Sequence, residues 1–207
     1  MFITTLPPSA EKLLTKFERV KWLKDFYLAG GTALALQYGH RQSVDLDFFT
    51  QKKINTSQLI KKLSKIGKLT LTKEEENTVE GILNDVKVSF MTYPYPMLEK
   101  EKKYSDNIKL ASPNDIAVMK LEAVAGRNTK KDFIDLYFYL QNEKANLQNL
   151  IKKLQLKFKG LTYDFYHLYK SLIYFVDADK DVMPLMLKKT DWPKIKKYFV
   201  NEIKKLA

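Results

Sequence analysis

The chain has 207 residues, of which 45% are hydrophobic and 13% aromatic, a composition that is typical of a globular protein and excludes a disordered chain. It contains no cysteine, which excludes disulfides, thiolate zinc sites and a cysteine nucleophile. The net charge of +12 favours a polyanionic partner.

The N-terminal segment, MFITTLPPSAEKLL, lacks a basic region followed by a long apolar core, and no apolar run in the chain approaches the length of a bilayer span. We therefore expect a cytoplasmic protein with no membrane contact. Ser9 can cap a helix that runs to about Lys24. Apolar residues at helical spacing along this segment predict that the helix packs on the edge of a sheet.

The stretch from Phe26 to Thr50, FYLAGGTALALQYGHRQSVDLDFFT, predicts a strand, a turn, a helix and a second strand. The first apolar run ends at Gly30 and Gly31, where the backbone can turn without a Cβ penalty. Thr32 can cap the helix that follows. Backbone N–H groups at such a helix N-terminus favour phosphate binding, although most Gly-Gly pairs before a helix are only tight turns.

Asp45 and Asp47 occupy alternate positions of the second predicted strand, residues 44–49, so their side chains share one face. Neighbouring carboxylates repel each other, and a divalent cation between them relieves the repulsion. Mg²⁺, with Mn²⁺ as the alternative, prefers oxygen ligands and keeps room for substrate phosphates. A lone Asp-x-Asp is more often a solvated strand face, and the argument for a metal site depends on its conjunction with the turn.

The next segment predicts a helix and three strands. Asn55 or Thr56 begins the helix, and strands follow at residues 68–73, 78–83 and 86–93. Asn84 and Asp85 supply a two-residue turn between the last two strands. The prolines of YPYP, residues 93–96, predict a loop, and its tyrosines either stack on a base or pin the loop to the core.

The combination of the Gly-Gly turn with Asp-x-Asp resembles the nucleotidyltransferase fold, and GHRQSVDLDFF is similar to the AbiEii/AbiGii toxin family of abortive-infection toxin–antitoxin pairs. The resemblance implies an α/β fold with a small mixed sheet, comprising a core over residues 1–111 and a helical region over residues 112–207 that closes a cleft. It implies Mg²⁺-dependent transfer of a nucleotide from an NTP to a hydroxyl acceptor, with RNA, including tRNA ends, as the expected acceptor. A cognate antitoxin is the implied protein partner.

A short strand is predicted at residues 108–111, and Ser112 or Asn114 can cap the helix that follows it. A second motif lies on this helix and the next one. The string KLEAVAGRNTKKDFIDL is similar to the same family's signature, Lys-Leu-x-Ala-x-x-x-Arg followed by Asp-x-x-Asp-Leu. Lys120 lies in an apolar helix face, where a lysine either snorkels or meets an anion. The resemblance assigns it to nucleotide phosphates. Arg127 shares this face, and it either binds nucleotide or forms a structural ion pair with Asp132.

The resemblance therefore implies the following site. The metal ligands are Asp45 and Asp47; the catalytic residues are Asp45, Asp47, Lys120 and Asp135; and the nucleotide-binding residues are Gly30, Gly31, Thr32, Arg41, Ser43, Lys120 and Arg127. His40 either positions substrate or only closes the turn.

The third carboxylate that commonly completes this fold's metal site is missing. Ser89 occupies its expected place in VKVSFMTY, and Asp85 is four residues away, about 13 Å along a strand. This departure implies a one-metal or weaker site, or a carboxylate supplied from elsewhere. The alternative functions are a weak or inactive nucleotide- or RNA-binding module and, with less support from the charge, transfer to a protein or a small molecule.

The C-terminal third is predicted to be helical, at residues 147–157, 162–176 and 192–206. Residues 151–207 carry 13 lysines and 6 acidic residues, a net charge of +7, which makes this third the better candidate for a nucleic-acid surface. Lysine-rich helices without such a role are also common.

Overall fold

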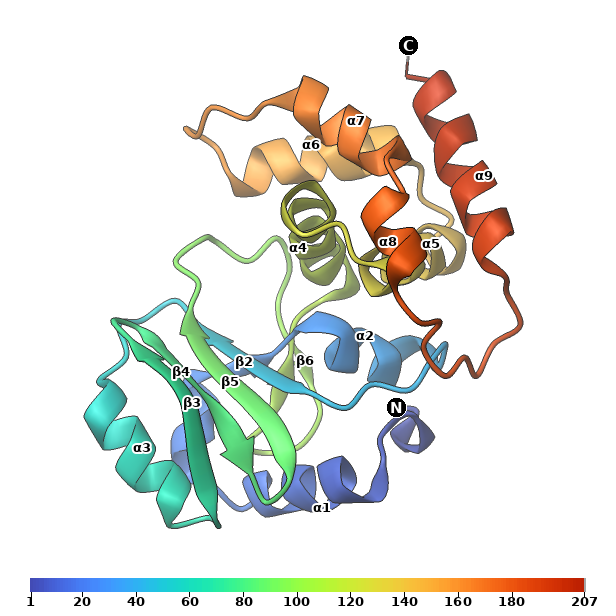
Figure 1. The fold of residues 1–207 in the computed structure, drawn as a ribbon. Helices are drawn as coiled ribbons and strands as arrows, with labels where there is room; N and C mark the ends of the chain where they lie inside the picture. The colour runs from blue at the N-terminus through green and yellow to red at the C-terminus, as the bar shows by residue number, and fades with distance from the viewer. Residues whose placement is uncertain (207) are drawn as a thin grey trace.

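The computed structural model describes residues 1–206 and contains a seven-stranded mixed sheet with helices packed around it (Figure 1). The strand order is β3-β4-β5-β2-β1-β7-β6, in which β2 pairs in parallel with β5, β1 pairs in parallel with β7, and the other neighbours are antiparallel. The strands are β1 Tyr27–Leu28, β2 Leu46–Thr50, β3 Leu69–Glu75, β4 Thr78–Leu83, β5 Val86–Thr92, β6 Lys102–Lys103 and β7 Lys109–Leu110. The expected α/β fold with a small mixed sheet is confirmed.

The local turn and cap signals give the elements predicted from them. Asn84 and Asp85 have φ of 48° and 64°, the left-handed conformation that a two-residue hairpin turn requires between β4 and β5. Asn55 accepts a hydrogen bond from the backbone N–H of Gln58 and begins α3, Thr56–Ser64. Ser112 accepts one from the N–H of Asp115 and begins α4, Pro113–Gly126.

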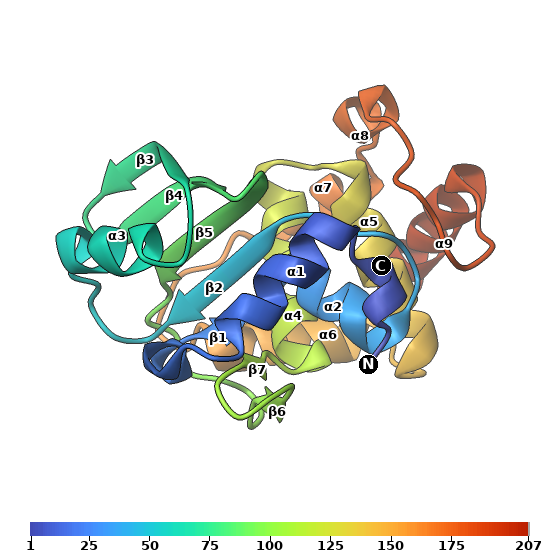
Figure 2. The ribbon, with the colours of Figure 1, turned by 90° about the horizontal axis from the view of Figure 1, so that it is seen from below.

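The N-terminal segment differs from the prediction. It forms α1, Pro8–Phe17, and a separate 3-10 helix, Lys21–Asp25, where one helix to Lys24 was expected. Helix α1 begins after Pro7, so Ser9 lies inside it and does not cap it. The ring of Phe17 lies 5.3 Å from that of Phe48, so α1 covers a face of the sheet, and the edge packing expected from the sequence is wrong. Figure 2 shows α1 lying across the sheet beside β2.

The second half of the described chain is helical. After α2, Gly30–Tyr38, the remaining helices are α5 Lys130–Asn142, α6 Leu147–Lys157, α7 Phe165–Ile173, α8 Val176–Lys180 and α9 Trp192–Lys204. The single helix predicted over residues 162–176 is instead α7 and α8, because Tyr174 takes an extended conformation between them. Figure 1 shows α4 to α9 gathered on one side of the sheet. The predicted division into a core over residues 1–111 and a helical region over residues 112–207 stays a prediction.

Helix α4 lies over the sheet on the face opposite α1, and a buried ion pair fixes the loop beneath it. The Lys157 Nζ lies 2.7 Å from an Asp115 oxygen and donates to the Pro96 carbonyl at 2.8 Å. Asp115 also accepts from the backbone N–H of Leu98 at 2.9 Å. These bonds tie α6 and α4 to residues 93–99, and so fix the position of Tyr93 beside the cleft described below. Within residues 1–206, no helix is long and apolar enough to cross a membrane.

Candidate active site

The turn at Gly30 and Gly31 opens α2 and is closely packed. Gly30 has φ of +65°, and a Cβ built on it would lie 2.7 Å from Asp47 Oδ2. A Cβ on Gly31 would lie 2.2 Å from a guanidinium nitrogen of Arg41. No side chain caps α2, so the N–H groups of its first turn are not taken by a cap. Only glycines fit this turn, which brings backbone donors, Asp47 and Arg41 together.

Replacing Gly31 with alanine is expected to lower the free energy of unfolding by about 1–3 kcal/mol, since Arg41 is held by two hydrogen bonds and cannot move away cheaply. Denaturant titration measures the effect. Gly126→Ala is the control, because a Cβ there meets nothing within 4 Å and alanine favours a helix. Equal stability of the two variants would contradict the packing argument.

The expected cap at Thr32 is absent. Thr32 lies inside α2, and its hydroxyl donates to the backbone carbonyl of Asp45 and lies 2.9 Å from the Ser43 hydroxyl. Thr32 and Ser43 are both buried, so in this structure they fix the segment before β2 against α2. Their contact with nucleotide stays a prediction.

Asp47 lies in β2, and Asp45 is the residue immediately before this strand. Both line the main cleft described below. Burial raises the pKa of the Asp47 carboxyl, and the charge of Asp45 raises it further, while a hydrogen bond from Ser89 opposes this shift. The Ser89 Oγ donates to Asp47 Oδ1 at 2.5 Å across the β2–β5 register. Ser89 therefore occupies the position next to Asp47 at which the sequence analysis sought a third acid.

The two carboxylates fit a divalent cation that also binds substrate phosphates. Asp47 is desolvated and repelled by Asp45, and a cation between them would relieve both effects. Among residues 1–206, no group of three or more histidine, cysteine, aspartate or glutamate side chains is arranged to hold a metal. Asp45 and Asp47 would thus supply two ligands, and phosphate oxygens and water the others.

A buried ion network lies beside this pair, between α4, α5 and the segment that precedes β2. Asp135 accepts two hydrogen bonds from the Arg41 guanidinium, both at 2.8 Å, and one from His40 Nε2 at 2.8 Å. Lys120 Nζ lies 2.8 Å from an oxygen of Asp135 and 2.8 Å from one of Asp132. Both aspartates are fully buried, so their charges must be balanced by these neighbours and, for Asp132, also by Arg127.

The neighbours keep both aspartates ionised. Burial alone raises the pKa of Asp132, but Lys120 and Arg127 bring it down to about 2. Burial likewise opposes ionisation of Asp135, yet Arg41 and Lys120 hold its pKa well below the usual range. Burial lowers the pKa of His40, so its imidazole is neutral at pH 7 and donates through Nε2.

This network bears on the roles that the resemblance implies for Lys120 and Asp135. The Lys120 side chain is 7% exposed and paired to two carboxylates, and Asp135 lines neither of the two cavities described below. Asp135 therefore positions Arg41 and Lys120 at the edge of the cleft. A catalytic role of Asp135 stays a prediction. Arg127 forms the ion pair with Asp132 that the sequence offered as an alternative, at 2.8 Å, while its side chain stays 64% exposed. Contact of Lys120 and Arg127 with nucleotide stays a prediction.

The main cleft has a volume of about 700 Å³ and is rich in cations. Charged residues lining it are Arg41, Lys87, Lys120, Arg127 and Lys131 on the positive side and Asp45, Asp47 and Asp181 on the negative side. Lys87 and Lys131, both exposed, were not predicted as site residues. Lys87 could have been found, because it is two residues from Ser89 and so shares its strand face.

A C-terminal segment, residues 181–185, forms one wall of this cleft. It is held by backbone hydrogen bonds to the segment between α2 and β2: the Gln42 N–H donates to the Leu185 carbonyl at 2.8 Å, and the Leu187 N–H donates to the His40 carbonyl at 2.9 Å. No sequence pattern indicated this pairing.

A second cavity of about 490 Å³ adjoins the main cleft and shares Asp47, Lys120 and Arg127 with it. It lies between α4 and the C-terminal halves of β2 and β5. Its other walls are mainly apolar and come from Gly30, Phe49, Met91, Tyr93, Met119, Glu122, Ala123 and Gly126. The cleft thus has a charged lobe and an apolar lobe that meet at Asp47. We call the second cavity the apolar lobe.

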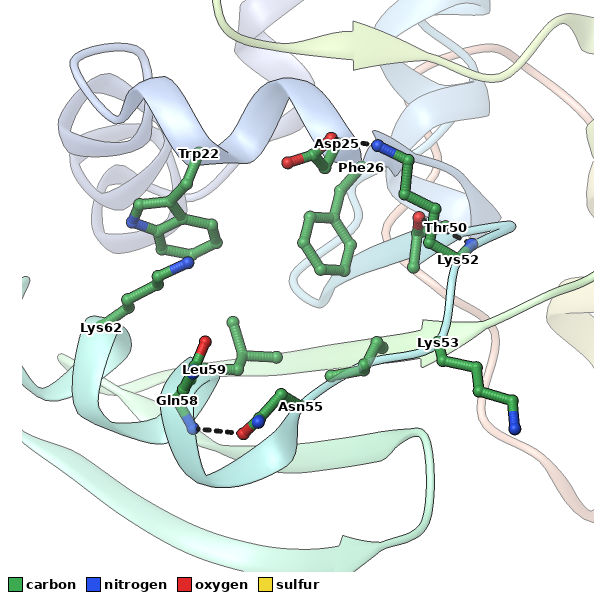
Figure 3. A pocket seen from close by; sticks show the side chains of 11 residues that line it. Trp22, Asp25, Phe26, Thr50, Lys52, Lys53, Asn55, Gln58, Leu59 and Lys62 are labelled. Atoms are coloured by element: carbon green, nitrogen blue, oxygen red, sulfur yellow. Dashed lines mark hydrogen bonds and ion pairs between the residues drawn. The ribbon is translucent and has the colours of Figure 1, made fainter.

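A third, separate pocket of about 220 Å³ lies between the 3-10 helix and α3 (Figure 3). Trp22, Phe26 and Leu59 line it, and its rim carries an Asp25–Lys52 ion pair at 2.7 Å and Lys62 over the Trp22 ring. It contains none of the predicted site residues. The chemistry implied by the sequence therefore belongs to the two-lobed cleft.

Comparisons with known proteins give a family match, a relative and a structural neighbour. A family model described as "Nucleotidyl transferase AbiEii toxin, Type IV TA system" matches residues 12–204. An uncharacterised protein of Aquifex aeolicus (strain VF5) is 37% identical over 183 residues, which cover 87% of each protein. A crystal structure of a candidate nucleotidyltransferase from H. pylori has a TM-score of 0.54 at 23% identity, covers 96% of each chain, and supports the same fold.

Proposed function

We propose that this chain, which belongs to the AbiEii family of nucleotidyltransferase toxins of type IV toxin–antitoxin systems, moves a nucleoside monophosphate from an NTP to a hydroxyl group of RNA. The observation that carries the proposal is the charged lobe, in which an uncapped helix N-terminus, two carboxylates and a set of cations face one cavity. Phosphate, metal and a hydroxyl acceptor can meet there.

Asp45 and Asp47 would hold Mg²⁺ or Mn²⁺, which when bound neutralises triphosphate charge and activates the attacking oxygen. The α2 N-terminus and the exposed cations Lys87, Arg127 and Lys131 bind the phosphates. The acceptor oxygen forms a bond to the α-phosphorus as pyrophosphate leaves, and no covalent enzyme intermediate is required. Positioning and electrostatic stabilisation then supply the catalysis.

Two hydrogen-bond sets prepare the site for this step. Ser89 holds Asp47 Oδ1, so the other oxygen, Oδ2, stays beside the Gly30 turn. Asp135 holds Arg41 against Gly31 from the far side. The chain therefore fixes the orientation of the carboxylate and of the turn before substrate arrives, which lowers the cost of reaching the reactive geometry.

RNA is the acceptor that the charge favours. The net charge is +12, and the cleft is lined by more basic than acidic residues, so a polyanion is attracted to it. A small-molecule acceptor would gain little from this excess. The family implies an antitoxin as the protein partner.

The position of Ser89 beside Asp47 favours one alternative, a catalytically weak or inactive module that binds nucleotide or RNA. Calorimetry with NTP and RNA separates it from an enzyme, because a binding module would retain affinity without turnover.

The test of transfer uses purified protein, total RNA, Mg²⁺ or Mn²⁺, and each of the four NTPs labelled in turn at the α-phosphate. We expect label in RNA from an α-labelled NTP and none from the same NTP labelled at the γ-phosphate, because pyrophosphate leaves. RNase treatment of the product must release the label. Absence of transfer with every NTP and both metals would overturn the proposal, and label on protein would redirect it to a different acceptor.

A further inference from the structure

The apolar lobe differs in chemistry from the charged lobe that it adjoins. Phe49, Met91, Tyr93 and Met119 form its walls, and Glu122 is the carboxylate on α4 that faces it. The two lobes share Asp47 and Arg127, so they lie side by side, and a ligand with phosphates in one is close enough to reach the other. A nucleotide has this division, since a charged phosphate chain is joined to a flat ring.

Glu122 is held in a fixed orientation. The Tyr93 hydroxyl donates to Glu122 Oε2 at 2.8 Å. Tyr93 itself is packed edge-to-face against Tyr95, at 4.9 Å between ring centroids, and lies under Lys157, whose Nζ is buried and hydrogen-bonded. A polar group fixed on an otherwise apolar wall discriminates between ligands, because a ligand that cannot pair with it leaves it unsatisfied.

We propose that the apolar lobe binds a nucleobase and that Glu122 selects bases that carry an exocyclic amino group. The proposal rests on the proposed function for the identity of the ligand as a nucleotide. An ionised carboxylate only accepts hydrogen bonds. The amino groups of cytosine and adenine donate to it, whereas the corresponding carbonyl oxygens of uracil and hypoxanthine place acceptor against acceptor.

The aromatic and thioether walls fit the faces of the ring. Phe49 and Tyr93 offer surfaces on which a base can stack, and stacking tolerates any base. Met91 and Met119 are flexible apolar side chains that adapt to rings of different size. The walls therefore bind a base, and Glu122 supplies the discrimination between bases.

Two pairs of nucleotides test the amino group, because CTP differs from UTP, and ATP from ITP, in having it in place of a carbonyl, together with an unprotonated ring nitrogen beside it. Calorimetry with Mg²⁺ is expected to show CTP and ATP binding about 10-fold more tightly than UTP and ITP. In Glu122→Gln the ratio should fall to about 3-fold or less, since an amide can also donate. Glu74→Gln, an exposed change of the same chemistry on β3, should retain the wild-type ratio.

Tyr93→Phe provides a second variant that keeps the ring and removes the hydroxyl. It removes one of the hydrogen bonds that hold Glu122, so the ratio should fall to a value between those of wild type and Glu122→Gln. Thermal unfolding of each variant shows whether it is folded. A ratio unchanged in both folded variants would overturn the role of Glu122.

The base in the lobe can come from the NTP or from the 3′ nucleotide of the RNA acceptor. Affinities for the free NTPs and for RNA oligonucleotides with different 3′ ends distinguish these two sources. Discrimination among free NTPs places the NTP's base in the lobe. Equal NTP affinities, with RNA oligonucleotides ending in C bound more tightly than those ending in U, place the acceptor's base there. Equal affinities in both series would overturn the proposal. Discrimination without label transfer would retain the nucleobase site and overturn only the transferase.

Discussion

Replacing Asp135 with asparagine is expected to lower the free energy of unfolding by about 3–5 kcal/mol, because it removes a buried charge that Arg41 and Lys120 depend on. Asp135 is completely buried and accepts from Arg41, His40 and Lys120. An amide can accept some of these bonds, but it carries no charge and its NH₂ group faces a donor. Denaturant titration at pH 7 measures the loss.

The matched control is Asp177→Asn, which removes an exposed carboxylate paired with Lys180 one helical turn away. No measurable change is expected there, since exposed pairs contribute little. If Asp135→Asn were as mild as this control, the buried network would not organise the site as described.

The stability effect of Asp135→Asn is expected to depend on pH. Asp135 has a folded-state pKa well below its usual value, and that of Asp132 is about 2, so each contributes stability that is present above the unfolded pKa of about 4. This contribution is lost as the pH falls toward the folded-state values. The difference in stability between wild type and Asp135→Asn should therefore shrink as the pH falls below about 4. A constant difference would mean that Asp135 stabilises the fold by packing alone.

Local signals allowed much of the fold to be predicted. The Asn84–Asp85 turn and the caps at Asn55 and Ser112 depend on residues only two or three positions apart, and each element begins or ends where its local chemistry requires. The helix breaks after Phe17 and at Tyr174 were missed. Both lie within segments of unbroken helical periodicity, so they depend on packing against the rest of the chain.

For the candidate site too, the local features could be predicted from the sequence and the long-range contacts could not. The Gly-Gly turn and the alternate aspartates could be read from the sequence because one strand and one turn bring them together. The buried network could not, since Arg41 and Asp135 are 94 positions apart and the sequence does not fix how α5 meets the segment before β2. The sequence left Lys120 either to snorkel or to meet an anion, and in the structure it is paired with Asp132 and Asp135 of the protein itself.

Asp47→Asn is expected to abolish transfer, with a loss of about 100-fold or more, and to leave the fold at least as stable as wild type. The loss follows because one of two metal ligands is removed, and metal stabilisation of the transition state is worth several kcal/mol. Asparagine is nearly isosteric and still accepts from Ser89. Asp85→Asn, in the exposed β4–β5 turn, is the matched control and should keep full activity.

The stability of Asp47→Asn separates the role of Asp47 from that of the buried Asp135. Burial and the charge of Asp45 raise the folded-state pKa of Asp47, so its ionised form costs stability above that pKa. In metal-free buffer at pH 7, the amide should therefore unfold at the same or a higher denaturant concentration than wild type, the opposite of Asp135→Asn. Adding Mn²⁺ should stabilise wild type and not the variant, because only wild type has both ligands. A variant that lost stability and kept its response to Mn²⁺ would show that Asp47 holds the fold together and does not bind the metal.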